Sequence, residues 1–424
     1  MTEHTKDTPR TAEGTPSAAA HRPHILVLHR WRDQHALYEN YIDHRDHRVT
    51  YVTTPLGWPS LPLTAAGIVE VTATDDIEQV HAAATALSAL FGPVDRVVAL
   101  NEGDLDTAAE LRARLGCPGQ LPGELARFRD KFVMCEAVAA AGVRTPAFAD
   151  APDATAVAGF AAAHGWPVVV KPRRGTASRG VLIIDSPAGL SALDGLPDEP
   201  RLVQEFCGDA IYHVDGLWTG SGLGPWRASR YVNTCADFAA GGVLGSVEED
   251  DPELVAALGE FTASIAGALS DRPWVFHLEV FVARGADGRP ELRFLEAGYR
   301  VGGAEIPFVW REVHGIDLMT AAVDVQLGRK PALTAPESWR TGGWLLVRTP
   351  VPAPCRVVAA QPLDPRDDGP YAQVVPPRGT VVPEVGGYEH VGARFRFRGS
   401  GTAQVESSIA KAAARFRLEC EAVA

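Results

Sequence analysis

One short stretch, residues 168–181 (VVVKPRRGTASRGV), restricts the fold more than any other part of the chain. The β-branched run Val168 to Val170 is typical of a buried strand, and Pro172, directly after Lys171, ends it. A loop of small residues follows, and the apolar run Val181 to Ile184 predicts a second strand and hence a hairpin. Glycines let the backbone approach a ligand closely, and free N–H groups on such a loop attract anions. A lysine beside this loop therefore indicates a polyphosphate site, although an ordinary exposed hairpin would have a similar sequence.

Length and composition exclude several classes of protein. The chain has 424 residues, enough for two or three domains, and its 46% apolar and 22% charged content is ordinary for an enzyme. A net charge of −13 argues against a nucleic-acid-binding surface, which needs clustered Lys and Arg. Six scattered cysteines without CxxC spacing fit neither a zinc site nor a disulfide framework. We see no membrane-spanning run and no signal peptide, and we therefore expect a cytoplasmic protein without membrane contact.

The pattern along the chain predicts a tail and three folded parts. Residues 1–22 are polar, and we expect them to be disordered. In residues 23–125 short apolar strands alternate with helices, which predicts a doubly wound parallel sheet without a GxGxxG fingerprint. Ligands of such sheets lie beyond the carboxyl ends of the strands, where Glu102 is found. Residues 126–206 predict a small α+β unit around the hairpin, and residues 207–424 a larger unit.

Two glutamates of the larger unit are predicted to face each other. Residues 274–282 (WVFHLEVFV) read as a strand, Asp287-Gly288 is a hairpin signal, and residues 292–296 read as the partner strand. Glu279 and Glu296 then occupy facing positions of an antiparallel pair. Two carboxylates on one face repel unless a cation lies between them, and Mg²⁺ suits this role because it takes oxygen ligands and phosphate.

Two more polar residues flank this pair. His277 lies two residues before Glu279 and hence on the same face, where either a structural role or a contact with substrate or phosphate fits the pattern. Arg300 follows the second strand in a glycine-rich loop. Its guanidinium can hold a carboxylate or a phosphoryl oxygen at two points.

The remaining segments are less informative. Residues 237–249 contain a glycine pair and are predicted to form a loop, and residues 402–420 are predicted to form a final helix packed on the core. Residues 331–424 as a whole are expected to complete the fold and to shape an acceptor pocket.

The order of these features resembles the ATP-grasp superfamily over roughly residues 24–330. It is carried by Lys131, Lys171 with its loop, Glu205, the YHVDG stretch from Tyr212, the HLE stretch from His277, and the segment from Glu296 to Gly303. The YHVDG and LEAGYRVGG stretches are most similar to the carboxylate–amine ligases, including the bacterial L-amino acid ligases. The resemblance implies an α/β and α+β ATP-grasp fold with an N-terminal doubly wound domain, a small inserted lid and a larger C-terminal domain.

The resemblance also implies a role for each site residue. The residues implied in ATP binding are Lys131, Lys171, Gly175, Thr176, Ser178, Gly180, Glu205, Phe206, Cys207 and Asp215. Glu279 and Glu296 would bind Mg²⁺, with Mn²⁺ as a substitute, and Arg300 and His277 would act in catalysis. The candidate substrate-binding residues are His213, Arg300, Gly302 and Gly303, together with Glu102, which is a candidate because of its place at the carboxyl edge of the predicted sheet. Many members of the superfamily have an asparagine two residues after the second glutamate, where this chain has Gly298, so the sequence leaves one metal or two open.

The function that the resemblance implies is an ATP-dependent ligase. A carboxylate substrate, an amino acid or a natural-product acid, would form an acyl phosphate with release of ADP, and an amine would then displace phosphate to form an amide. Its partners would be ATP and small carboxylates and amines, with no nucleic acid, and homodimers are common among such ligases. One alternative is a carboxylase that uses bicarbonate, although no carrier segment is evident. A second alternative is a nucleotide-binding protein that has lost catalysis, which Gly298 supports and the lysines and glutamates oppose.

Overall fold

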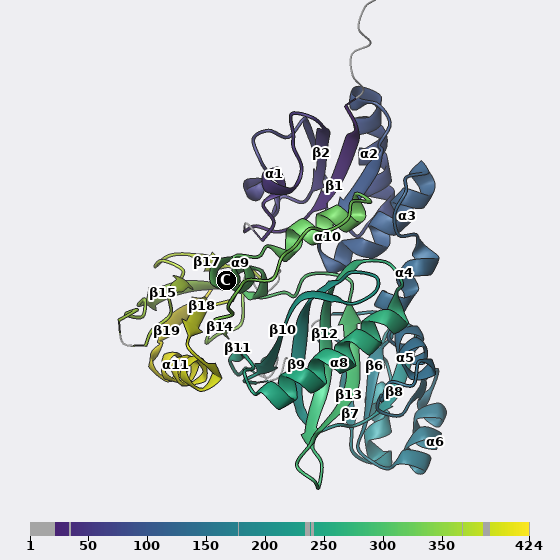
Figure 1. The fold of residues 1–424 in the computed structure, drawn as a ribbon, viewed down its shortest axis with the longest axis vertical. Coiled ribbons are helices and arrows are strands. Elements are labelled where there is room, and N and C mark those ends of the chain that lie inside the picture. Colours follow the sequence, from purple (N-terminus) through teal and green to yellow (C-terminus); the bar gives the residue numbers. More distant parts are fainter. Residues whose placement is uncertain are drawn as a thin grey trace, which may run out of the picture.

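The computed structural model describes residues 22–33, 35–176, 178–233, 238, 241–366, 368–384 and 391–423. The predicted disordered tail therefore lies outside the described residues except for Arg22. The described chain contains a parallel sheet, an antiparallel lid sheet, a large antiparallel central sheet and a small C-terminal sheet (Figure 1). This mixture of one parallel sheet with antiparallel sheets confirms the predicted fold class. Within the described residues, no helix combines the length and apolar character needed to span a membrane.

The N-terminal part forms the predicted parallel sheet, with the order β3-β2-β1-β4. Its strands are β1 (His24–His29), β2 (Arg48–Thr53), β3 (Gly67–Glu70) and β4 (Arg96–Ala99). The helical segments of this part are α1 (Tyr38–Tyr41), α2 (Ile77–Phe91), α3 (Leu105–Leu115) and the 3₁₀ turns Trp58–Ser60 and Glu102–Asp104. Helices α2 and α3 pack their alanines and leucines on the buried valines and leucines of the strands. Glu102 begins the 3₁₀ turn that comes shortly after β4 and so lies at the carboxyl edge of this sheet.

A side chain from far along the chain extends the edge of this sheet. Helix α10 (Leu318–Gln326) packs beside β4, and its last residue, Gln326, is buried. Gln326 Oε1 accepts from the Ala99 N–H at 2.9 Å, and its Nε2 donates to the Ala99 carbonyl at 2.8 Å. Arg112 Nη2 donates to the same Oε1 at 2.9 Å. The amide thus supplies the two hydrogen bonds that a neighbouring strand would give to β4.

The predicted hairpin belongs to a four-stranded antiparallel lid sheet with the order β5-β8-β6-β7. Its strands are β5 (Phe148–Asp150), β6 (Val168–Pro172), β7 (Leu182–Ile184) and β8 (Arg201–Glu205). The adjacent helical segments are α4 (Pro122–Arg129), α5 (Lys131–Ala140), α6 (Ala154–His164) and the 3₁₀ turn Pro187–Leu193. Val168 pairs with Ile184, as expected for the hairpin, and Val168 and Val170 pack in one core with Phe160 of α6.

The central sheet has eight antiparallel strands in the order β13-β12-β9-β10-β11-β14-β18-β16. Its strands are β9 (Ala210–Trp218), β10 (Leu223–Tyr231), β11 (Leu244–Glu248), β12 (Trp274–Arg284), β13 (Pro290–Gly298), β14 (Thr341–Val347), β16 (Ala372–Val374) and β18 (Ala393–Gly399). Helix α8 (Pro252–Leu269) crosses one face of this sheet (Figure 1). The even-numbered residues of β12, from Trp274 to Val282, share the hydrophobic core of α8. Because strand residues alternate between faces, His277 and Glu279 point to the other face.

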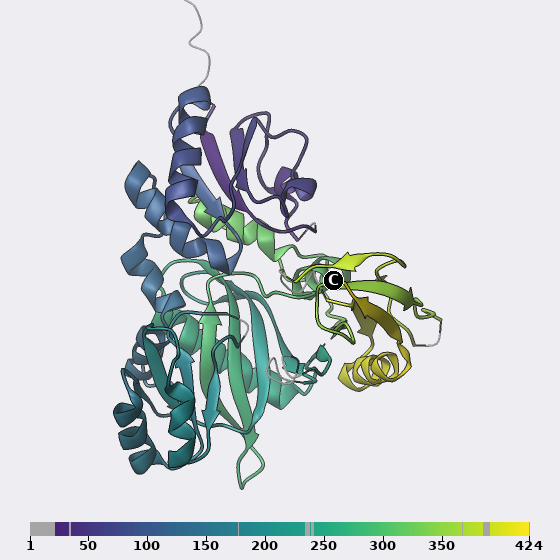
Figure 2. The same cartoon turned by 180° about the vertical axis from the view of Figure 1, so that it is seen from behind.

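Helix α9 (Ile306–His314) and the last hundred residues complete the molecule. Helix α11 (Thr402–Arg415) covers β14 and β18, while β15 (Cys355–Ala360), β17 (Val381–Val382) and β19 (Leu418–Ala422) form the small C-terminal sheet. Seen from behind in Figure 2, this C-terminal part lies to one side of the central sheet.

Two local predictions were wrong. The loop predicted over residues 237–249, of which 237, 239 and 240 lie outside the described residues, contains the buried strand β11. The strand lies between β10 and β14, and its sequence LGSVE lacks an apolar pattern because two of its buried residues are polar. Ser246 is bonded to His213 on β9, and Glu248 is bonded to His314 on α9. The helix predicted over residues 402–420 ends at Arg415, and its last residues form β19, whose partner β15 is distant in sequence.

Replacing Gln326 by Ala should destabilise the protein without touching the candidate site. The change removes the partner of the Ala99 N–H and carbonyl and one partner of the buried Arg112 guanidinium group. Each buried polar group without its hydrogen bond lowers the free energy of unfolding by about 1–3 kcal/mol. Urea unfolding should show a loss of at least about 2 kcal/mol, and hydrogen exchange at the Ala99 amide should accelerate. Lys330→Ala, an exposed change four residues further on, is the control and should leave both measurements unchanged.

Candidate active site

The centre of the site is the paired register of β12 and β13. Glu279 lies directly opposite Glu296, and His277 lies opposite Gly298. The register shifts by a bulge just after Glu279, so the pairing of the two glutamates is followed at once by an irregular step. The facing positions predicted from the hairpin pattern are therefore present. They place two carboxylates on the face of the central sheet that α8 does not cover.

Two lysines approach these carboxylates from the lid side. Lys131 begins α5, and its Nζ lies 3.3 Å from Glu296 Oε2 and donates to the Gly175 carbonyl at 2.9 Å. Lys171, at the end of β6, is buried. Burial lowers the pKa of Lys171, and the charges of Glu296 and Glu279 act against that shift. The two lysines and the two glutamates thus share one site between the lid and central sheets.

The loop between β6 and β7 folds over Lys131. The Lys131 N–H donates to the Arg173 carbonyl at 2.8 Å, and Arg179 Nη2 donates to Thr176 Oγ1 at 3.1 Å. Ser178 and Gly180 have positive φ values of 56° and 71°. These left-handed turns bring the loop backbone back toward the strand, which suits close approach to a phosphate group.

A chain of alternating charges connects the three sheets at the site. Arg300 Nε donates to Glu102 Oε2 at 2.6 Å, and Arg129 Nη1 donates to Glu102 Oε1 at 2.5 Å. Arg129 Nε donates in turn to Asp106 at 3.0 Å, and Arg174 of the lid loop donates to the other Asp106 oxygen at 2.8 Å. Burial raises the pKa of Glu102, but Arg300 and Arg129 outweigh this and lower it to about 2. Glu102 is therefore a largely buried anion that is bonded to two guanidinium groups.

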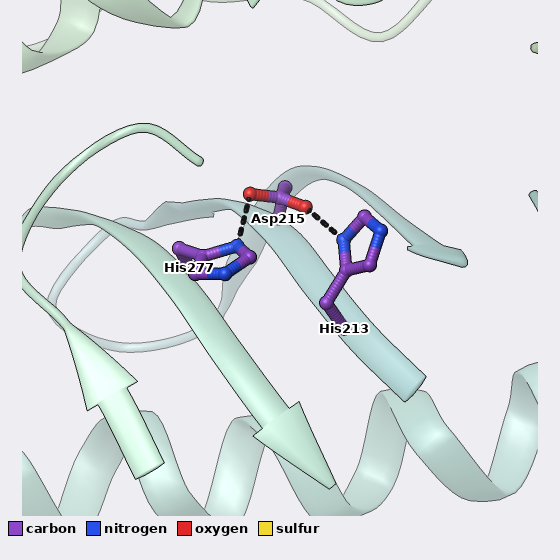
Figure 3. Close-up of side chains that lie close together, drawn as sticks. All are labelled: His213, Asp215 and His277. Atoms are coloured by element: carbon purple, nitrogen blue, oxygen red, sulfur yellow. Dashed lines mark hydrogen bonds and ion pairs between the residues drawn. The ribbon is translucent and has the colours of Figure 1, made fainter. Parts of the chain in front are cut away.

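A buried carboxylate joins two histidines on the same face (Figure 3). Asp215 on β9 accepts from His213 Nδ1 at 2.6 Å and from His277 Nδ1 at 2.9 Å. The Nε2 atom of His213 is bonded to Ser246 Oγ at 2.7 Å. Gly302 closes over this cluster, since a Cβ there would overlap with Asp215 Oδ1. Burial raises the pKa of Asp215, but the two histidines more than offset this and lower it.

Glu279 is held by its neighbours on the same face. Tyr231 donates its hydroxyl to Glu279 Oε1 at 3.0 Å, and His277 Nε2 lies 3.8 Å from the same oxygen. Burial lowers the pKa of His277, yet Asp215 and then Glu279 raise it to about 9. Glu296 has Lys131 as its cationic neighbour. The two facing carboxylates fit a divalent cation, because Mg²⁺ and Mn²⁺ accept carboxylate oxygens as ligands.

The residues predicted to meet adenine lie where β8 leaves the lid sheet. Glu205 Oε2 accepts from the Ala147 N–H at 3.2 Å, and Phe206 is partly exposed. Burial raises the pKa of Cys207 to about 11. Asp215 lies elsewhere, on β9, with both carboxylate oxygens bonded to histidines.

Several residues of the site were not predicted from the sequence. The most important are Arg129, Asp106, Tyr231 and Ser246. The sequence offers no signal for them because their partners come from other strands and helices.

Replacing Glu102 by Gln should reduce stability in a pH-dependent way. The pKa of Glu102 falls from 4.5 to about 2, so the ionic contribution is complete above pH 4.5 and is lost as the pH falls through 2. At pH 7 the free energy of unfolding should drop by about 3 kcal/mol, and the difference from wild type should shrink between pH 4.5 and 2. Urea unfolding at several pH values measures this difference in the free energy of unfolding. Glu110→Gln, on the exposed face of α3, is the control. A difference that does not change with pH would contradict this assignment.

Comparison with known proteins identifies the fold. No protein-family model matches the chain. It is 25% identical over 280 residues to the L-arginine-specific L-amino acid ligase of Bacillus subtilis, a match that covers 62% of this chain and 64% of that relative. The match thus spans slightly less than two thirds of the relative's length.

Solved structures cover almost the whole chain. The L-amino acid ligase from Bacillus licheniformis has a TM-score of 0.71 and 16% identity, with 94% of this chain and 99% of that chain covered. N5-carboxyaminoimidazole ribonucleotide synthetase from Thermotoga maritima (TM-score 0.65, 14% identity, 94% and 100% covered) and biotin carboxylase from Campylobacter jejuni (TM-score 0.65, 14% identity, 94% and 92% covered) have the same fold. The chain therefore has the fold of these enzymes, which is the fold that its sequence resemblance to the ATP-grasp superfamily predicted.

Proposed function

We propose that the chain is an ATP-dependent carboxylate–amine ligase that forms an amide or peptide bond through an acyl phosphate and releases ADP and phosphate. The observation that carries the proposal is the shared site of Lys131, Lys171, Glu279 and Glu296, with Arg300 on the adjoining loop. The likeness to L-amino acid ligases supports an amino acid as one substrate.

In this proposal the nucleotide lies between the lid and central sheets. Lys131 and Lys171 hold phosphate oxygens, and the loop from Gly175 to Gly180 covers them with its backbone N–H groups. The end of β8, with Glu205, Phe206 and Cys207, meets the adenine ring. A divalent cation between Glu279 and Glu296 would neutralise charge on the phosphates.

The chemistry then follows from charge and exclusion of water. A substrate carboxylate attacks the γ-phosphate, and charge spreads over the transferring oxygens, where the two lysines stabilise it. Arg300, held by Glu102, faces the developing acyl phosphate and the tetrahedral state that an amine forms on it. The closed loop keeps water away from the acyl phosphate, which would otherwise hydrolyse.

The carboxylase reading is the second candidate, because biotin carboxylase and carboxyaminoimidazole ribonucleotide synthetase share the fold. In that reaction ADP release requires bicarbonate. A ligase of amino acids instead releases ADP only when its carboxylate substrate is present.

A screen of ADP release should separate the two reactions. We expect release to depend on amino acids, tested singly and in pairs, and a positive pair should give a product whose mass is the sum of the two minus one water. Mass spectrometry of each positive mixture identifies the pair. ADP release that requires bicarbonate and ignores every amino acid would favour the carboxylase.

Replacing Glu296 by Gln should abolish turnover. The change removes one of two facing carboxylates and the charge beside Lys131, and loss of such a group costs at least about a hundredfold in rate. ADP release under saturating substrates measures the effect. Glu291→Gln, a half-exposed glutamate on the same strand paired with Arg144, is the matched control and should keep wild-type activity. An unchanged rate in the Glu296 variant would end the ligase proposal.

A further inference from the structure

The face that carries the two glutamates has four paired positions on β12 and β13. Glu279 lies opposite Glu296, and His277 lies opposite Gly298. Three of these four positions carry side chains with metal-binding atoms, and the fourth is a glycine. Gly298 therefore supplies no side-chain ligand, and the side chain of Arg300 lies beside it, with its Cγ 3.4 Å from the position that a Cβ would take.

The two ring nitrogens of His277 face two different carboxylates. Its Nδ1 donates to Asp215 Oδ1 at 2.9 Å, which leaves Nε2 on the side of Glu279, 3.8 Å from Oε1. Donors around a six-coordinate cation of this size lie about 3 Å apart when adjacent and about 4 Å apart when opposite. The observed 3.8 Å is therefore compatible with one cation bound by both residues.

The surroundings of His277 are those of a metal-binding histidine. Such histidines donate their other ring N–H to a carboxylate, which fixes the tautomer and raises the basicity of the free nitrogen. Asp215 is buried and supplies this carboxylate, and the backbone of Gly302 packs so closely on it that a Cβ would not fit there. Tyr231 gives Glu279 a comparable support through its hydroxyl.

His213 has no ring nitrogen that faces the two glutamates. Its Nδ1 is bonded to Asp215 and its Nε2 to Ser246, so both ring nitrogens are occupied. The ligand atoms of His213, Asp215 and His277 lie within 4.8 Å of one another, which is close enough for a metal site of their own. The two hydrogen bonds to Asp215 use both of its oxygens, however, and this favours Asp215 as the support of His277 rather than as a ligand.

We propose that His277 Nε2, once it has released its proton to solvent, is a ligand of the nucleotide-associated divalent cation, which it binds together with Glu279 and Glu296. The inference rests on the proposed nucleotide site and deepens it. A nitrogen donor in place of a third oxygen raises the affinity for Mn²⁺ relative to Mg²⁺, because imidazole suits transition metals better than Mg²⁺. Asp215 acts through His277 and is a positioning residue.

Electron paramagnetic resonance on bound Mn²⁺ tests this directly. The full-length protein is loaded with Mn²⁺ and a non-hydrolysable ATP analogue, and pulsed spectra are compared for unlabelled and ¹⁵N-histidine-labelled samples. We expect nitrogen modulation that changes with the label in the wild type and disappears in His277→Gln. The affinity for Mn²⁺ should fall about tenfold or more in that variant, with a smaller loss for Mg²⁺.

Two matched variants make the assignment specific. His213→Gln removes the other imidazole of the cluster and should retain the modulation, and His164→Gln changes an exposed histidine of α6 and should behave as wild type. Asp215→Asn should weaken the affinity for Mn²⁺ in the same direction as His277→Gln. Circular dichroism establishes that each variant is folded, and the labelled wild type decides the question even if His277→Gln does not fold.

The outcomes separate the metal ligand from the ligase reaction. Mn²⁺ that binds with the nucleotide but shows no histidine nitrogen overturns the role of His277, and so does modulation that vanishes only in His213→Gln. Neither result touches the ligase proposal, which ADP release by the same wild-type preparation tests separately. A histidine modulation in a preparation that releases no ADP with any substrate would instead support the ligand and count against the ligase.

Discussion

The pairing register of β12 and β13 is the constraint on which the site depends. A slip by one residue would turn Glu279 and His277 toward α8 and bring Leu278 to the site. The core beneath α8 prevents this slip, because Trp274, Phe276 and Leu278 are completely buried there. Each large apolar side chain contributes about 1.5–3 kcal/mol when buried, so the hydrophobic face of the strand fixes the position of the polar face.

The second requirement is that three sheets stay in a fixed relation. The chain of charges from Arg300 through Glu102, Arg129 and Asp106 to Arg174 joins the central sheet, the N-terminal sheet and the lid loop. Buried ion pairs often add little net stability, because desolvation offsets the Coulomb attraction. Their effect here is positional. The parallel N-terminal sheet delivers Glu102 at the carboxyl edge of β4, and that carboxylate sets the place of Arg300.

Local sequence patterns predict part of this structure. They do not predict the strands and hydrogen bonds that depend on residues from other parts of the chain. The β6–β7 hairpin and the facing glutamates follow from strand alternation and turn residues within about thirty positions. Strand β19 could not be predicted because its partner β15 is far away in sequence. The sequence LGSVE does not predict the buried strand β11, although its partner β10 precedes it directly, because Ser246 and Glu248 are buried through bonds to His213 and His314. The hydrogen bonds between Gln326 and Ala99 at the edge of β4 likewise have no signal in the sequence. The domain boundaries and the roles of the ATP-binding and substrate-binding residues stay predictions.

The way in which Arg300 is held has a consequence for the proposed reaction. Its Nε donates to Glu102 and its Nη1 to the Val301 carbonyl at 3.1 Å, which fixes the plane of the guanidinium. Burial lowers the pKa of Arg300, but Glu102 raises it by more, so the group stays charged in a site with little water. A guanidinium that is fixed before the substrate binds does not need to reorient when negative charge develops, and this is how a preorganised charge lowers a barrier. Glu102 would therefore serve catalysis through the orientation of Arg300, even if it never contacts a substrate atom.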